Sequence, residues 1–158
     1  NLNDYLAFDK IVCCGGSFMV KEEYIKAGDW AKITELTRNA VNLMLGFELA
    51  HIGINCENES EANSLTSALA NLFGMPVKEG KGGNFVGTAF ELLKAPYLGA
   101  KGHIAIKTNS IIRAIAHLEA KGFKFNPDAM KTDDKGKLVA AYLSDEFGGF
   151  AIHLLQKK

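Results

Sequence analysis

The sequence is poor in cysteine. Three cysteines occur among 158 residues, and two of them, Cys13 and Cys14, are adjacent. Adjacent cysteines do not provide the spaced pairs from which a disulfide framework is built. Such usage is typical of a reducing compartment, and no signal peptide pattern opens the chain. We therefore expect a cytoplasmic protein.

Long apolar runs and charge of one sign are also missing. No apolar stretch reaches the roughly 18 residues of a membrane helix, which predicts no membrane-spanning segment. Lys and Arg number 18, as do Asp and Glu, and no basic cluster indicates a nucleic-acid partner. The 47% hydrophobic and 23% charged residues are typical of a globular protein. Because the chain starts at Asn1 rather than at methionine, we interpret it as a piece of a longer protein.

Residues 1–45 form the first of two predicted domains. The segment KIVCCGGSFMV (10–20) predicts an apolar strand that a Gly-Gly pair interrupts. Two helices are predicted next, over 21–30 and 30–45. Asp29 is suited to capping the second helix, and Gly46 is suited to ending it.

Residues 46–158 form the second predicted domain and contain an internal repeat. The stretch AHIGI (50–54) recurs as GHIAI (102–106), and each copy precedes a helical pattern and a strand-rich tail. A repeat indicates a duplicated structural unit. We therefore predict an α+β fold of two βαβββ modules, 47–96 and 101–158, that forms a half-barrel cleft. The third strand of the first module is expected to be short.

Alternation along the strands predicts a set of polar side chains in this cleft. Successive residues of a strand point to opposite faces, so a polar residue between apolar ones faces away from the module's helix. The first and last strands of the modules each carry one such residue: His51, Glu91, His103 and His153. Small neighbours, Gly53 and Ala105, leave room beside them. A structural role is commoner for any one such histidine, but three of the four histidines at equivalent positions favour a shared site.

Three imidazoles and one carboxylate are suitable ligands for a borderline divalent cation such as Zn²⁺, Ni²⁺, Co²⁺, Fe²⁺ or Mn²⁺. An octahedral ion with four protein ligands keeps two positions for water or for a bidentate substrate. The sequence therefore predicts a divalent-metal cofactor and a small-molecule substrate or ligand. Glu91 and His153 are the candidate catalytic residues.

The pattern HIGI…FELL…GHIAI…AIHLL, with a helix after each histidine-bearing strand, resembles the vicinal oxygen chelate superfamily, which includes glyoxalase I. The resemblance covers residues 47–158. It implies the same four metal ligands, because this superfamily takes them from the first and last strands of each module. It also implies a departure: glyoxalase I commonly has a proton-shuttling carboxylate where this chain has His153.

The segment VCCGGSFMVKEEYIKAGDWAKITELTRNAV looks like the last strand and helix of a bacterial 2-keto-3-deoxy-6-phosphogluconate / 4-hydroxy-2-oxoglutarate aldolase, a (β/α)₈ barrel. In that family a GGSW loop helps to hold the substrate phosphate. Gly15, Gly16 and Ser17 take its place here, and the backbone N–H groups of such a turn suit phosphate. The resemblance implies that 1–45 is the end of an aldolase fused to the second domain. The Schiff-base lysine of that family lies upstream, so we expect this remnant to be inactive.

Three functions are open at this point. The first is a metal-dependent enzyme that acts on a small 2-oxo acid or vicinal dioxygen compound and stabilises an enediolate. The second is a ligand-binding module that regulates an upstream aldolase domain without turnover. The third is an assembly domain. We expect a homodimer, with the cleft built either within one chain or across the dimer.

Overall fold

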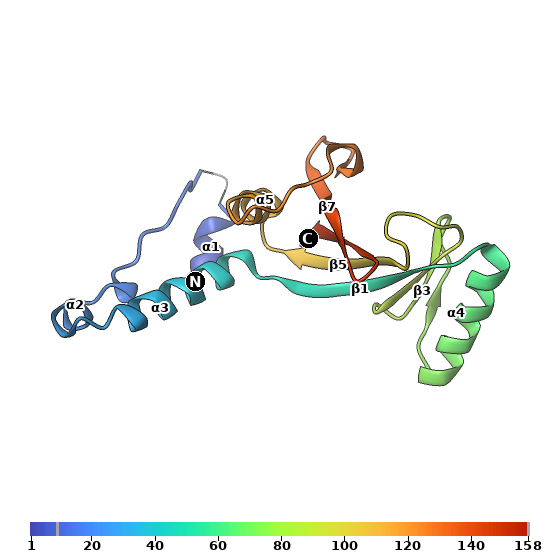
Figure 1. Ribbon diagram of the computed structural model, residues 1–158, viewed down its shortest axis with the longest axis horizontal. Coiled ribbons are helices and arrows are strands. Elements are labelled where there is room, and N and C mark those ends of the chain that lie inside the picture. The colour runs from blue at the N-terminus through green and yellow to red at the C-terminus, as the bar shows by residue number, and fades with distance from the viewer. Residues whose placement is uncertain (9, 158) are drawn as a thin grey trace. The chain divides into compact units, whose positions relative to one another are not determined.

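The computed structural model describes residues 1–8 and 10–157. Within them the chain divides into two compact units, unit 1 (Asn1–Phe47) and unit 2 (Glu48–Lys158). Unit 1 is helical, whereas unit 2 is built around one mixed β-sheet (Figure 1).

Unit 1 contains α1 (Leu2–Leu6), the 3₁₀ helix η1 (Ser17–Met19), α2 (Glu22–Ala27) and α3 (Trp30–Leu45). Both predicted helices are present as α2 and α3. The Asp29 carboxylate caps α3 by accepting a hydrogen bond from the Lys32 N–H at 3.0 Å. Gly46 ends α3 in the left-handed conformation, with φ of 57°, where a side chain would be strained.

The strand predicted over residues 10–20 is wrong. Residues 11–16 have no regular secondary structure, and the chain then enters η1. A strand requires a neighbouring strand to pair its backbone groups. The described part of unit 1 contains no strand that could be this neighbour.

Unit 2 consists of two βαβββ modules, as predicted. Module one comprises β1 (Glu48–Asn55), α4 (Glu59–Phe73), β2 (Val77–Lys78), β3 (Gly83–Val86) and β4 (Phe90–Leu93). Module two comprises β5 (Gly102–Thr108), α5 (Ile111–Glu119), the 3₁₀ helix η2 (Pro127–Ala129), β6 (Lys131–Thr132), β7 (Leu138–Phe147) and β8 (Phe150–Gln156). With four residues against the ten of β7, β3 is the short third strand that the sequence predicts.

All eight strands join one sheet in the order β2-β3-β4-β1-β5-β8-β7-β6. The first and last strands of each module are parallel neighbours, since a helical crossover returns the chain in the same direction. β1 and β5 pair antiparallel and join the modules. The second half of the strand order therefore mirrors the first.

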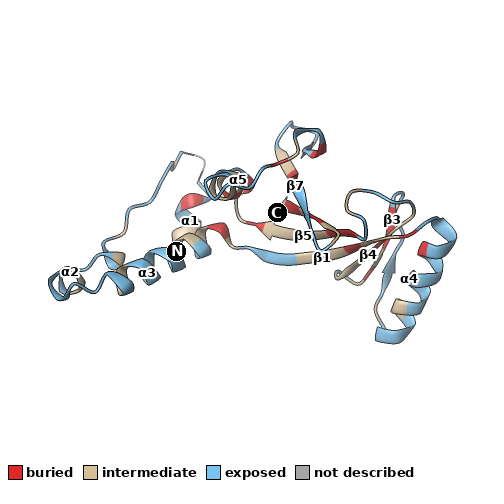
Figure 2. Cartoon of the chain, viewed as in Figure 1, coloured by how far each residue is buried: buried red, intermediate tan, exposed pale blue. Residues whose placement is uncertain are grey.

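Each helix covers strands of its own module. α4 contacts β3 and β4, and α5 contacts β7 and β8, while the outer side of α4 is exposed (Figure 2). Under α4 lies a hydrophobic cluster of buried residues, joined by Phe90 and Ile54: Cys56, Ala62, Val86 and Leu92. Phe90 and Leu92 thus face the helix, and Glu91 between them faces the other side of the sheet.

A β-bulge changes the alternation at the start of β1. Leu49 pairs with Ile106 and His51 pairs with Ala105, so Ala50 is an extra residue on β1. Such a bulge reverses which residues of the preceding segment point to each face. Strict alternation would place Glu48 on the helix side. Glu48 instead lies on the same side as His51.

The three cysteines are free thiols, of which Cys56 is buried. Burial, together with the charge of Glu61, raises the pKa of the Cys56 thiol, so it packs as a small apolar side chain. Across the described ranges, no helix combines the length and apolarity needed to cross a bilayer.

We expect residues 46–158 to fold without unit 1, because the sheet, its covering helices and the cluster under α4 all lie in unit 2. The fragment should show a mixed helix and sheet circular dichroism spectrum and a single cooperative thermal transition close to that of the full chain. A non-cooperative melt of the fragment, beside a cooperative one for the full chain, would show that the sheet depends on unit 1.

Candidate metal centre

Four polar side chains meet on the sheet face opposite α4. They come from the four central strands: Glu91 from β4, His51 from β1, His103 from β5 and His153 from β8. These are the residues that the sequence indicated as ligands. All four belong to unit 2 of one chain.

Strand register explains how these side chains fit beside one another. Each of the four has a small residue directly across the neighbouring strand. Gly53 pairs with Glu91 and His103, and Ala105 pairs with His51 and His153. The imidazole of His103 lies over Gly53 so closely that a Cβ at that position would overlap the ring. The absence of a side chain at Gly53 therefore gives the His103 ring its place in the cluster.

Three ligand atoms form a nearly equilateral triangle. The Nε2 atoms of His51 and His103 lie 3.1 Å apart. Glu91 Oε2 lies 3.3 Å from the first and 3.2 Å from the second. One ring nitrogen from each of the three clustered histidines lies within 4.8 Å of the corresponding nitrogens of the other two.

The triangle has the size of a ligand face around a divalent ion. Ligands about 2.1 Å from a Zn²⁺-like ion lie about 3.0 Å apart at adjacent corners of an octahedron and about 3.4 Å apart in a tetrahedron. The observed edges fall between these values. Opposite corners of such an octahedron are about 4.2 Å apart, and the ligand atom of His153 lies within 4.8 Å of those of His51 and His103.

His153 has no protein partner for either ring nitrogen. Its side chain is 5% exposed, and neither Nδ1 nor Nε2 makes a hydrogen bond to any described residue. The Nδ1 atom of His103, a residue only 3% exposed, is likewise unpaired. A buried polar atom without a partner costs about 1–3 kcal/mol. The unpaired ring of His153 therefore indicates a bound group beyond the polypeptide, and a divalent ion fits because neutral imidazole is a common metal ligand.

The charge states of the site suit ligation. Burial alone would raise the pKa of Glu91, but hydrogen bonds to His103 and His51 outweigh it and lower that pKa to about 2. Burial, reinforced by the electrostatic effects of His103, His51 and Lys131, lowers the pKa of His153 to about 3. At neutral pH the site offers an ionised carboxylate and a neutral imidazole, the forms that bind metal.

Two aromatic rings that the sequence analysis missed flank the cluster. Tyr142 pairs with His153 and stacks on its ring, with centroids 4.4 Å apart and planes 12° apart. Phe85 pairs with Glu91 and meets the His51 ring edge-on, with centroids 5.4 Å apart. Burial, with smaller effects of nearby acidic groups, raises the pKa of Tyr142 to about 12, so its phenol stays protonated. Alternation within β7 was the one sequence signal that could have placed Tyr142 on the cluster's face. Because the residues on both faces of that strand are apolar in sequence, alternation does not show which face is which.

The turn predicted to hold phosphate lies in unit 1. Gly15 and Gly16 precede η1 and Ser17 begins it, and none of the three is buried. A phosphate-binding role for this turn stays a prediction.

Comparison with known proteins relates the N-terminal segment to aldolases. The KDPG and KHG aldolase family matches residues 1–36. The KHG/KDPG aldolase of Escherichia coli K12 is 46% identical over 41 residues, which are 26% of this chain and 19% of that enzyme. A 2-dehydro-3-deoxy-phosphogluconate aldolase of Haemophilus influenzae is 39% identical over 44 residues, which are 28% of this chain and 21% of that enzyme. The aldolase resemblance of this segment is confirmed, and the chain spans about a fifth of the length of these relatives.

Solved structures resemble the sheet-containing part of the chain. Hypothetical protein BH1468 from Bacillus halodurans C-125 matches with a TM-score of 0.51 and 18% identity, over 71% of this chain and 95% of that one. Methylmalonyl-CoA epimerase from Mycobacterium tuberculosis matches with a TM-score of 0.51 and 13% identity, over 73% and 90%. Unit 2 has the glyoxalase, or vicinal oxygen chelate, fold. This confirms the predicted fold class, and at these identities the likeness shows the fold alone.

We expect Gly53→Ala to disturb the packing of His103 in the cluster. The added methyl group would overlap the imidazole, so the ring must leave the cluster or the strands must shift, at about 1–3 kcal/mol. Gly82→Ala is the matched control, because a Cβ there meets nothing within 4 Å. Chemical denaturation should show the loss for the first variant and a change below about 0.5 kcal/mol for the second. Equal stabilities would contradict the packing of His103 on Gly53.

Metal-free protein should lose stability as the pH falls from about 7 to about 5, partly through His153. The folded-state pKa of about 3 lies below the unfolded value of about 6.5. The unfolded chain therefore takes up a proton in this window and the folded chain does not, which lowers stability by roughly 1–2 kcal/mol. His153→Leu should flatten the pH dependence measured by denaturation.

A control variant and the pH range show whether the measured pH dependence comes from His153. His117→Leu, which changes a half-buried histidine on α5 outside the cluster, should keep the wild-type dependence. Stability linked to the depressed pKa of Glu91 is lost only below about pH 4.5 and so adds little in this window. A wild-type slope in His153→Leu would contradict a buried, neutral His153.

Proposed function

We propose that unit 2 is a divalent-metal-dependent domain that acts on a small 2-oxo acid, or on another compound with two adjacent oxygen atoms. The proposal depends above all on His153. Both of its ring nitrogens are buried without a partner among the described residues. Its ligand nitrogen lies within 4.8 Å of those of His51 and His103.

Four residues would hold the ion: His51, Glu91, His103 and His153. One carboxylate and three neutral imidazoles leave about one positive charge on a divalent centre, and six-coordination leaves two positions open. When bound, the ion supplies Lewis-acid polarisation of substrate oxygens. The near-complete burial of His103 and His153 keeps water from part of the site, which strengthens charge interactions there.

Proton transfer beside the chelated oxygens is the proposed chemistry, and Glu91 and His153 are its candidate residues. They occupy equivalent positions on the last strand of each module. Glyoxalase I commonly has a carboxylate at the second of these positions. Glu91→Gln and His153→Gln keep the approximate size of each side chain and remove its basicity. They therefore test separately whether Glu91 or His153 transfers the proton.

A ligand-binding module without turnover is the second candidate function. The pKa of Glu91 is lowered to about 2 and that of His153 to about 3, so both are weak bases at neutral pH. Weak bases reduce the contribution of general acid–base catalysis and leave ligation intact. In this version the domain binds the 2-oxo acid and regulates an aldolase.

We also propose that the parent protein carries an aldolase domain ahead of unit 2, in a cytoplasmic homodimer. The match of residues 1–36 to the aldolase family supports the fusion. A 2-dehydro acid is a 2-oxo acid, so the proposed substrate class agrees with the compounds named for the aldolase relatives.

Metal content tests the proposed centre. Elemental analysis, and calorimetric titration of chelator-treated protein with each of the candidate ions, should give about one ion per chain. His51→Ala, His103→Ala and His153→Ala should each weaken binding by roughly 100-fold or more, since changes even beyond the direct ligands cost about 10–100-fold. His117→Ala is the control and should bind as wild type. Protein that neither contains nor takes up an ion would remove the proposal.

Hydrogen exchange separates the two candidate functions. Pyruvate in D₂O, followed by proton NMR, should lose its methyl signal faster with metal-loaded protein than with metal-free protein. Loss of this rate in Glu91→Gln or His153→Gln, in protein that elemental analysis shows still holds its ion, would identify the residue that moves the proton. Calorimetric binding of pyruvate without faster exchange would support the module without turnover.

A further inference from the structure

We infer that the substrate of this centre carries a second anionic group, a carboxylate or a phosphate, held by lysines in a cavity next to the cluster. The inference rests on the proposed metal function and names its substrate class. The cavity has a volume of about 900 Å³. Its lining includes Glu48, Lys107, Asp133, Lys137, Leu155 and Lys157.

Strand register places this cavity one step along the strands from the cluster. Lys107 pairs with Glu48 on β1 and with Leu155 on β8, so these three residues share one sheet face. Lys107 follows Ala105 by two positions, and Leu155 follows His153 by two, which puts them on the cluster's face. Two strand residues span about 6.6 Å. This spacing is within the length of one extended small molecule.

The acidic residues of the cavity already have partners. Lys157 Nζ lies 3.0 Å from Glu48 Oε2. Asp133 Oδ1 accepts hydrogen bonds from two backbone N–H groups of its own turn, at 2.9 Å and 2.8 Å. Within the described residues, no carboxylate lies at ion-pair distance from the ammonium group of Lys107 or of Lys137. Lys107 acts electrostatically on Glu48, but neither ammonium group is held in a short ion pair, so both can turn to a ligand.

Apolar surface between the lysines indicates an aliphatic spacer in the ligand. Val139 and Leu155 contribute to the lining, and the methylene stems of the lysines add to it. An anionic end group gains charge-assisted hydrogen bonds from the ammonium groups. The cavity's volume lies within the roughly 300–1,000 Å³ of small-molecule sites. The geometry matches a 2-oxo acid with its oxo-acid end at the cluster and a second anion about 7 Å or more away.

A series of 2-oxo diacids measures this separation. The metal-loaded full chain is titrated by calorimetry with 2-oxosuccinate, 2-oxoglutarate, 2-oxoadipate and 2-oxopimelate. Affinity should peak at one length, and 2-oxoadipate should bind roughly ten-fold more tightly than 2-oxohexanoate, the monoacid of equal length. Competition by acetate and by inorganic phosphate then identifies which end group the lysines prefer.

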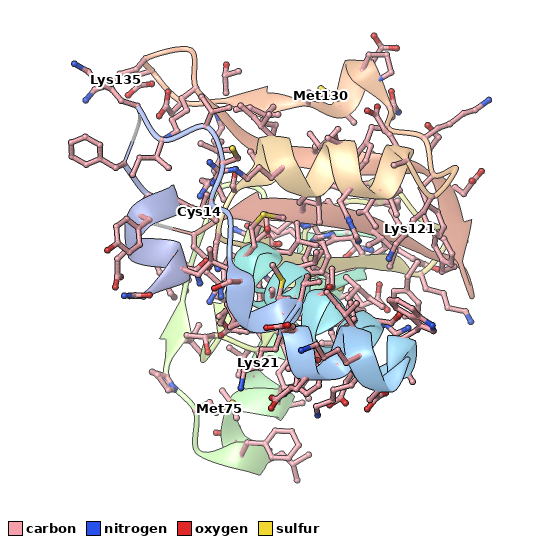
Figure 3. The ribbon with its side chains drawn as sticks, turned by 90° about the vertical axis from the view of Figure 1, so that its left-hand side faces the viewer. Cys14, Lys21, Met75, Lys121, Met130 and Lys135 are labelled. Atoms are coloured by element: carbon pink, nitrogen blue, oxygen red, sulfur yellow. The ribbon has the colours of Figure 1, made fainter. Side chains whose placement is uncertain are left out.

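Lysine variants assign the effect to the cavity. Lys107→Ala and Lys137→Ala should each weaken the diacid by roughly ten-fold and leave the monoacid unchanged. Lys135→Ala is the matched control. It lies in the same turn as Lys137, does not line the cavity and extends outward (Figure 3).

The outcomes separate this inference from the metal function. Equal binding of diacid and monoacid to loaded protein, unaffected by the lysine variants, overturns the inference and leaves the metal centre standing. Protein that binds no metal, yet binds inorganic phosphate in a manner lost in Lys107→Ala, overturns the metal function and leaves the lysine site standing.

Discussion

The antiparallel pairing of β1 with β5 is the contact on which the candidate site depends. Each module alone contributes two of the polar residues, and only across this seam do His51 and His103 come within 3.1 Å through their Nε2 atoms. A slip of one residue between paired strands would turn every side chain to the other face. It would place Ile104 where His103 now lies. The register of this one strand pair therefore also determines how the candidate ligands lie relative to one another.

Burial of the cluster links its polarity to the stability of the fold. His103 and His153 are 3% and 5% exposed, so their unpaired nitrogens destabilise a metal-free chain. An ion that binds the folded state gives a partner to one ring nitrogen of His153, which removes part of this cost, and it adds its own binding free energy. The aromatic contacts of His51 and His153 hold the rings in place when no ion does so. Rings held in this way are organised before the ion arrives, which favours ligation.

Features repeated along the chain could be predicted from sequence, whereas features that depend on neighbours in space could not. The recurrence of AHIGI as GHIAI indicated the modules, and period-two alternation indicated the four polar residues. Phe85 and Tyr142 flank equivalent positions, but they lie on strands of four and ten residues, so the repeat does not align them. The strand predicted over residues 10–20 failed for a related reason. Its apolar composition carries no information on whether a neighbouring strand exists to pair with it.

The bulge at Ala50 determines which residue of β1 lies beside the lysines of the cavity. Without the extra residue, strict alternation would put Leu49 rather than Glu48 on the cluster's face beside β5. The cavity would then contain three lysines, Lys107, Lys137 and Lys157, and one carboxylate, that of Asp133. With the bulge, Glu48 pairs with Lys157 at 3.0 Å, and two ammonium groups remain. Two ammonium groups match one carboxylate or phosphate, because each such group presents several acceptor lone pairs. The bulge thereby adds one negative charge to the cavity, which then has three lysines against two carboxylates and one excess positive charge for an anionic end group, and it does so without changing any residue of the cluster.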